Sequence, residues 1–191
     1  MAKILILLLL VQQLNSQFIV SSYYEIRNKN VVRQNYEESC GAASIATILN
    51  LIDVKRYSEN DILQKLKQNN NNNNIGTNLI SFMQMKQALK LLGFHSVGYQ
   101  INQSIFNYFK IPVIVKIEND PRYPHFVVVM NYSGDYVKIF DPNFGEYISS
   151  KEQFYKLWDK NNNGGYVLII KPKLLFIDQI NIELNGKLID N

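Results

Sequence analysis

The single cysteine of this sequence, Cys40, stands directly before a run of small and aliphatic residues. From Gly41 to about Ile52 the run has no proline and no strand-like alternation, which predicts a buried helix with Cys40 on its first turn. The unpaired N–H groups and the positive dipole end of such a helix favour a thiolate over a thiol. Cys40 is therefore a candidate nucleophile, although a lone cysteine on an apolar helix is also consistent with a small buried hydrophobic residue.

A thiolate nucleophile needs a base, a group that orients the base, and donors for the oxyanion that forms on the attacked carbonyl. Of the two histidines, His125 opens the apolar run 126–130, where it either faces a cleft or is a polar residue satisfied at the rim of a sheet. For His95 we favour an ordinary structural role. Gln34, six residues before Cys40, carries an amide N–H₂ that could reach an oxyanion beside the sulfur, although a lone glutamine carries little information.

The candidate orienting group is Asp141, which ends the predicted strand 136–140. A tight turn at Tyr132–Asp135 predicts that this strand and the one beginning at His125 form an antiparallel hairpin. Such a hairpin returns the carboxylate to the edge that carries the imidazole. There Asp141 could accept the imidazole N–H and fix its tautomer, or it could simply end a strand before a turn.

The elements that must position these residues change type near residue 94. Helical periodicity and caps predict helices first, and period-two or short apolar runs predict strands afterwards. This order indicates an α+β fold with a helical layer packed against a twisted antiparallel sheet. The predicted helices are 41–52, a second capped by Ser58 with Asp61, 81–92 ending at Gly93, 103–109 and 151–158; the predicted strands are 94–99, 112–117, 125–131, 136–140 and 166–171.

Composition limits the classes of function. With 191 residues and 47% hydrophobic side chains, the chain has enough apolar material for one compact domain. The net charge of +4 is spread along the sequence without a basic block, so we expect no nucleic-acid partner. We also expect neither a cofactor nor a metal ion.

The first residues resemble an export signal. Met1–Lys3 followed by the apolar run Ile4–Val11 predicts a signal peptide over residues 1–16 and a periplasmic or extracellular location. The apolar run is shorter than the roughly 20 residues that a spanning helix needs, so we expect no stable membrane insertion after its removal. A single cysteine in an oxidising compartment cannot serve an internal disulfide, which favours a reactive role for it.

The remaining boundaries follow from composition. Residues 17–30 show no clean period and predict an extended lead-in before a domain over 31–172. The asparagine-rich stretch 69–74 predicts a solvated loop between two helices. Residues 173–191 form an apolar–polar tail whose role the pattern does not indicate.

Several blocks together resemble the bacteriocin-processing, double-glycine-leader peptidases, family thirty-nine of the cysteine peptidases. They occur in the family's order over about residues 31–171. The blocks are Gln34-x5-Cys40-Gly41-Ala42-Ala43-Ser44-x-Ala46-Thr47-Ile48-Leu49, Leu89-x-x-Leu92-Gly93-Phe94, Pro112-Val113-Ile114-Val115, His125-Phe126-Val127-Val128 and Asp141-Pro142-x-x-Gly145.

This resemblance implies a papain-like fold and a cysteine endopeptidase acting on a peptide or protein substrate. Cys40 would be the nucleophile, His125 the general base and then acid, Asp141 the orienting carboxylate, and Gln34 the oxyanion donor. Family members cut a leader peptide after Gly-Gly, and many belong to ATP-driven exporters, whereas this chain resembles the free-standing, exported members. Two alternatives stay open: a non-catalytic module that binds a leader peptide or secretion partner, and a cell-wall amidase or acyl transferase on the same architecture.

Overall fold

The computed structural model describes residues 20–69, 80–118 and 125–172. The predicted signal peptide, the asparagines from 70 onward and the tail 173–191 lie outside this part of the chain. Within it, no helix is both long and apolar enough to cross a bilayer.

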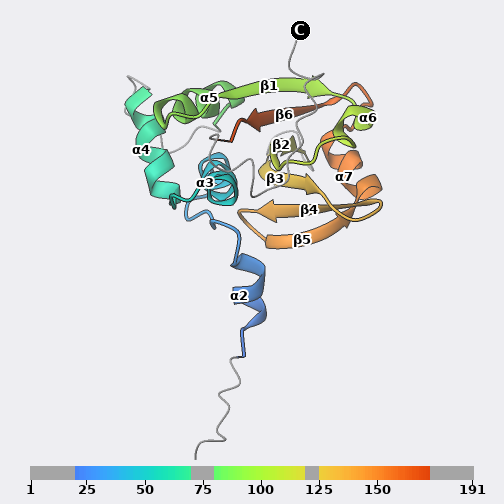
Figure 1. Ribbon diagram of the computed structural model, residues 1–191, viewed down its shortest axis with the longest axis horizontal. Helices are drawn as coiled ribbons and strands as arrows, with labels where there is room; N and C mark the ends of the chain where they lie inside the picture. Colours follow the sequence, from blue (N-terminus) through green and yellow to red (C-terminus); the bar gives the residue numbers. More distant parts are fainter. Residues whose placement is uncertain (1–19, 70–79, 119–124, 173–191) are drawn as a thin grey trace, which may run out of the picture.

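An antiparallel sheet of six strands runs through the middle of the molecule (Figure 1). The strands lie in the order β1-β6-β2-β3-β4-β5. Their bounds are β1 Ser96–Ile101, β2 Val113–Ile117, β3 His125–Asn131, β4 Tyr136–Asp141, β5 Gly145–Ser150 and β6 Gly165–Ile170. The predicted hairpin is confirmed, because β3 and β4 pair antiparallel across the turn at Tyr132–Asp135.

Helices α3 (Cys40–Ile52), α4 (Glu59–Asn69) and α5 (Phe82–Leu91) cover one face of the sheet. Almost every residue of α3 is buried, and the helix packs on β3 as well as on the two helices beside it. A glycine at position 41 permits the close approach to α5, since a Cβ there would come within 2.6 Å of the Met85 methyl group. The start of α3 is therefore held by packing from both sides.

The opposite face carries the short helix α6 (Gln103–Phe106) and helix α7 (Lys151–Trp158). Phe106, Phe154 and Trp158 fill this layer, with the rings of Phe154 and Trp158 stacked at a centroid distance of 5.4 Å. The α+β prediction, with a helical layer packed on an antiparallel sheet, is confirmed. The sheet is in addition covered on its second face.

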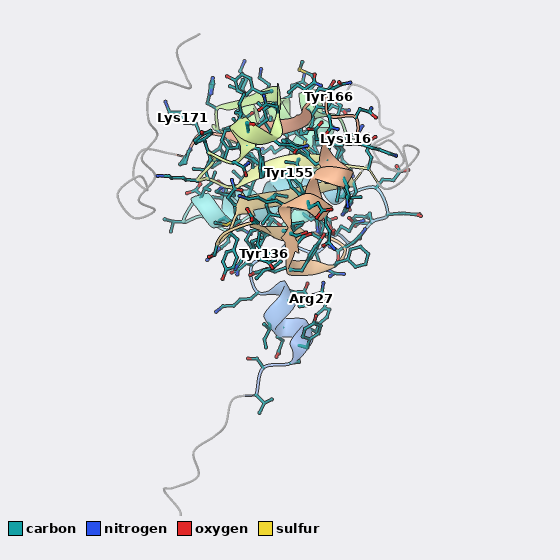
Figure 2. The ribbon with its side chains drawn as sticks, turned by 90° about the vertical axis from the view of Figure 1, so that its right-hand side faces the viewer. Arg27, Lys116, Tyr136, Tyr155, Tyr166 and Lys171 are labelled. Atoms are coloured by element: carbon teal, nitrogen blue, oxygen red, sulfur yellow. The ribbon has the colours of Figure 1, made fainter. Side chains whose placement is uncertain are left out.

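The predicted helix 103–109 is shorter than expected, since α6 ends at Phe106. Two further stretches differ from the prediction in kind. The lead-in 17–30 was predicted to be extended, but Tyr23–Asn28 forms helix α2, because Ser22 and Glu25 make a reciprocal capping box. In Figure 1, and from the side in Figure 2, this helix stands below the body of the molecule, and none of its residues is buried. Strand β5 was not predicted at all, since it is a half-exposed edge strand with little apolar alternation.

Candidate active site

Cys40 is the first residue of α3, as its sequence context predicts. The side chain is nearly buried, with 5% of the residue surface exposed, and it forms no disulfide. Ser39, the residue before the helix, does not bond to the helix end through its side chain. The first-turn N–H groups, including that of Cys40, therefore receive no cap from Ser39 and can serve an anion that forms beside the sulfur.

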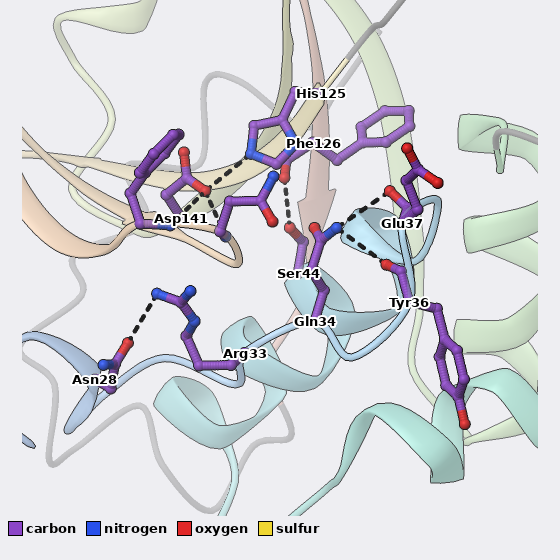
Figure 3. A network of polar contacts seen from close by, with 11 residues as sticks. Asn28, Arg33, Gln34, Tyr36, Glu37, Ser44, His125, Phe126 and Asp141 are labelled. Atoms are coloured by element: carbon purple, nitrogen blue, oxygen red, sulfur yellow. Dashed lines mark hydrogen bonds and ion pairs between the residues drawn. The ribbon is translucent and has the colours of Figure 1, made fainter. Parts of the chain in front are cut away.

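His125 and Asp141 come together at one end of the β3–β4 hairpin. The Nε2 atom of His125 lies 2.9 Å from Oδ1 of Asp141 (Figure 3). The same carboxylate oxygen accepts the backbone N–H groups of Asn143 at 2.7 Å and Phe144 at 3.2 Å. Three donors on one oxygen fix the carboxylate, so the imidazole has a rigid partner.

The second contact of the imidazole is the thiol. Cys40 lies close enough to the His125 ring to raise its pKa, and because Nε2 faces Asp141, Nδ1 is the ring nitrogen available to the sulfur. Strand β3 thus carries the ring to the first turn of α3. Sulfur, imidazole and carboxylate lie in series, although they are separated by 85 and 16 positions along the sequence.

The electrostatics of this series favour a protonated ring. Burial lowers the pKa of His125, but the hydrogen bonds to Asp141 and Cys40 and the negative charges of both groups outweigh it and raise the pKa to about 9. At neutral pH the ring is therefore an imidazolium between two acidic partners. An imidazolium at this place can donate its proton to a leaving group.

Gln34 lies beside this series on the segment that leads into α3. Its backbone N–H donates to the carbonyl of Pro142 at 3.2 Å, which joins the segment to the end of β4 next to Asp141. Its amide nitrogen donates to the carbonyls of Tyr36 at 3.0 Å and Glu37 at 3.2 Å, while its buried Oε1 has no hydrogen-bond partner among the residues that the structure describes. In Figure 3 the Tyr36 ring points away from His125 and Asp141.

His95 is not part of the site. It is exposed and precedes β1, which is separated from β3 by β6 and β2. Its backbone carbonyl accepts a hydrogen bond from Lys171. Among the described residues, no group of three or more His, Cys, Asp or Glu side chains is arranged to hold a metal ion.

Sequence reasoning missed two polar residues that support the site. Ser44, one helical turn after Cys40, donates from its fully buried hydroxyl to the carbonyl of Phe126 at 2.9 Å. A serine four residues after Cys40, on the same face of an apolar helix, was a usable signal in the sequence for a polar contact near the sulfur. Glu59 of α4 bonds the segment before Cys40, and no local pattern indicated this, since an acid at a helix start is ordinary.

Comparison with known proteins places this chain in a family. The model of the peptidase C39 family matches residues 28–174. A probable functional amyloid protease, FapD, of Pseudomonas fluorescens is 34% identical over 140 residues, which cover 73% of this chain and 62% of that protein. The lactococcin-G-processing and transport ATP-binding protein LagD of Lactococcus lactis is 29% identical over 147 residues, or 76% of this chain and 19% of LagD.

A solved structure agrees with the sequence relatives. The peptidase domain of Streptococcus ComA, a bifunctional ABC transporter involved in a quorum-sensing pathway, superposes with a TM-score of 0.62 at 24% identity, covering 75% of this chain and 98% of that domain. This likeness concerns the fold. Because the family model spans most of the sequence, the chain belongs to the peptidase C39 family of papain-like cysteine peptidases.

Proposed function

We propose that this chain is a cysteine endopeptidase in which Cys40, His125 and Asp141 act as a catalytic triad. The observation that carries the proposal is the 2.9 Å contact between His125 and Asp141, on a ring whose pKa Cys40 also raises. Family membership supports the reaction class, and the arrangement of these side chains supports the proposed roles.

In the proposed reaction the Cys40 sulfur attacks a peptide carbonyl and forms a C–S bond, and the carbonyl oxygen becomes an oxyanion. His125 gives its proton to the leaving amine as the C–N bond breaks, which leaves a thioester on the enzyme. The neutral ring then takes a proton from water, whose oxygen attacks the thioester and releases the acid. Asp141 holds the ring in one orientation throughout.

The oxyanion needs donors, and the backbone N–H of Cys40 is the first of them. Gln34 is the proposed second donor. Because both amide hydrogens of Gln34 face the carbonyls of Tyr36 and Glu37, one of these bonds must be exchanged when a substrate enters. The role of Gln34 therefore includes a small local rearrangement of the segment that carries it.

For the substrate we propose a peptide cut after glycine, of the double-glycine leader type. The support is the family resemblance and LagD, a relative whose name describes lactococcin G processing. A second substrate class to be tested is a functional amyloid protein, because FapD is described as a probable protease of that kind. The predicted signal at residues 1–16 further leads us to propose that cleavage takes place in the periplasm or outside the cell.

The test compares wild-type protein with Cys40→Ala on a panel of Gly-Gly peptides. We expect the variant to lose cleavage entirely while keeping its melting temperature within a few degrees, since one sulfur atom is removed from a nearly buried site. The measurement is mass spectrometry of the products, which identifies the new terminus. Equal turnover by both proteins would rule out the proposed chemistry, and cleavage elsewhere than after glycine would rule out the proposed substrate class.

A further inference from the structure

Glu59, the first residue of α4, is an acid in an unusual place. Only 2% of its surface is exposed, although glutamate is rarely this buried without a partner. Among the ion pairs of the described residues, none includes Glu59. Burying a charged or strongly polar group is costly, so the contacts that hold this one need an explanation.

All the hydrogen bonds of the Glu59 carboxylate go to the segment immediately before Cys40. Oε2 accepts the side-chain amide of Asn35 at 2.6 Å and its backbone N–H at 3.2 Å, and Oε1 accepts the same backbone N–H at 3.0 Å. The hydroxyl of Ser39 lies against Oε1. One side chain of α4 therefore holds the residue after Gln34 and the residue before Cys40.

The contact with Ser39 bears on the donors for the oxyanion. A serine before a helix ordinarily turns its hydroxyl onto the N–H groups of the first turn. Here the Ser39 hydroxyl instead meets Glu59 and the carbonyl of Tyr36, and no cap bond forms. The N–H groups beside Cys40 thus keep their capacity for an anion.

We propose that Glu59 is a positioning residue of the peptidase: it sets the segment 34–39, and through Ser39 it keeps the first turn of α3 uncapped for the oxyanion. The inference rests on the proposed function. The positioning role depends on the length of the Glu59 side chain (its reach) and on its hydrogen bonds, and not on its charge.

Three substitutions separate reach from charge. Glu59→Gln keeps the reach: a carbonyl oxygen in the place of Oε2 accepts both Asn35 donors, the new amide donates to Ser39, and the Ser39 proton goes to the Tyr36 carbonyl 2.8 Å away. Glu59→Asp keeps the charge but is one methylene too short to hold Asn35 and Ser39 together. Glu59→Leu removes every hydrogen bond at similar volume.

We expect kcat on a cleaved peptide to fall roughly 10- to 100-fold in Glu59→Asp and Glu59→Leu with little change in KM, because small misplacements near the reacting atoms cost rates of that order. In Glu59→Gln it should stay within about 3-fold. The rate of Cys40 alkylation by iodoacetamide provides a second readout, and all rates are normalised to the folded fraction. Asp61→Asn is the matched control, since this acid lies in the same first turn but its carboxylate accepts hydrogen bonds from the backbone N–H and hydroxyl of Ser58 and not from the segment before Cys40.

The outcomes distinguish the two claims. If Cys40→Ala cleaves as well as wild type, the proposed function fails whatever Glu59 does. If wild type cleaves, Cys40→Ala does not, and Glu59→Asp keeps wild-type kcat and alkylation rate, the positioning role alone is refuted. A loss in Glu59→Gln equal to that in Glu59→Asp would also refute it, because a side chain of the same length and without the charge would then fail to support catalysis.

Discussion

His125 is central to the proposed chemistry, because it lies between Cys40 and Asp141 and interacts with both. Its pKa of about 9 lies above the ordinary value of 6.5, so the folded chain keeps the ring protonated across the interval between them. The imidazolium is present below pH 9 and is lost as the pH rises through that value. A mechanism that needs this proton for the leaving amine should therefore lose activity on the alkaline side near pH 9.

Asp141→Asn tests this account of the ring. Removing the carboxylate charge takes away the electrostatic attraction of Asp141 and weakens its hydrogen bond to the ring, while the desolvation that lowers the pKa of His125 remains. We expect the alkaline limb of kcat/KM to move toward neutral pH, together with a fall in kcat. The measurement is a pH–rate profile of both proteins on one peptide. An alkaline limb that stays near pH 9 in the variant would assign it to another group.

At the scale of elements, the site depends on the register between α3 and β3. Val128 pairs with Phe140 across the hairpin, so Phe126 comes opposite Pro142. A proline has no N–H to offer, and the Phe126 carbonyl is satisfied instead by the hydroxyl of Ser44, as Figure 3 shows. Because Ser44 lies one turn after Cys40 and Phe126 directly follows His125, this bond ties the helix that carries the proposed nucleophile to the strand that carries the proposed base.

Ser44→Ala should weaken both stability and catalysis. An unsatisfied buried carbonyl costs about 1–3 kcal/mol of unfolding free energy, and the helix becomes free to shift along the strand. We expect a lower denaturation midpoint and a several-fold lower kcat per folded molecule. Thr47→Val is the matched control: Thr47 is equally buried on the same helix, but its hydroxyl accepts only the N–H of Val32 at 2.9 Å. Equal effects of the two substitutions on kcat would deny Ser44 a specific role.

The elements also show how far the sequence can be read. Helix α7 was predicted with its observed bounds, since a serine cap precedes an apolar pattern of helical period. The proximity of His125 and Asp141 followed from one tight turn, because the end of the second strand of an antiparallel hairpin lies beside the start of the first. The bonds of Glu59 could not be predicted, as its partners lie 20 and 24 residues away and nothing local favours their approach.

At the scale of the whole molecule, two layers share one sheet. Val127 and Val129 of β3 face the layer of α6 and α7, whereas Phe126 and Val128 face α3. A strand that serves both layers cannot lose its packing on one side and keep its position on the other. The active site on one face should therefore unfold together with the aromatic cluster on the other, as a single cooperative unit.

The chain provides a probe for each layer. Trp158, the sole tryptophan, lies in the far layer with its ring 4.9 Å from that of Phe106, and Cys40 lies in the near layer. We expect the change in Trp158 fluorescence and the loss of peptidase activity to have the same urea midpoint. Phe154→Ala, which opens a cavity in the far layer only, should lower both midpoints together by an amount equivalent to about 3–5 kcal/mol. Activity that vanished well before the fluorescence change would mean that the site layer melts alone, and the shared sheet would then not be what holds sulfur, ring and acid in place.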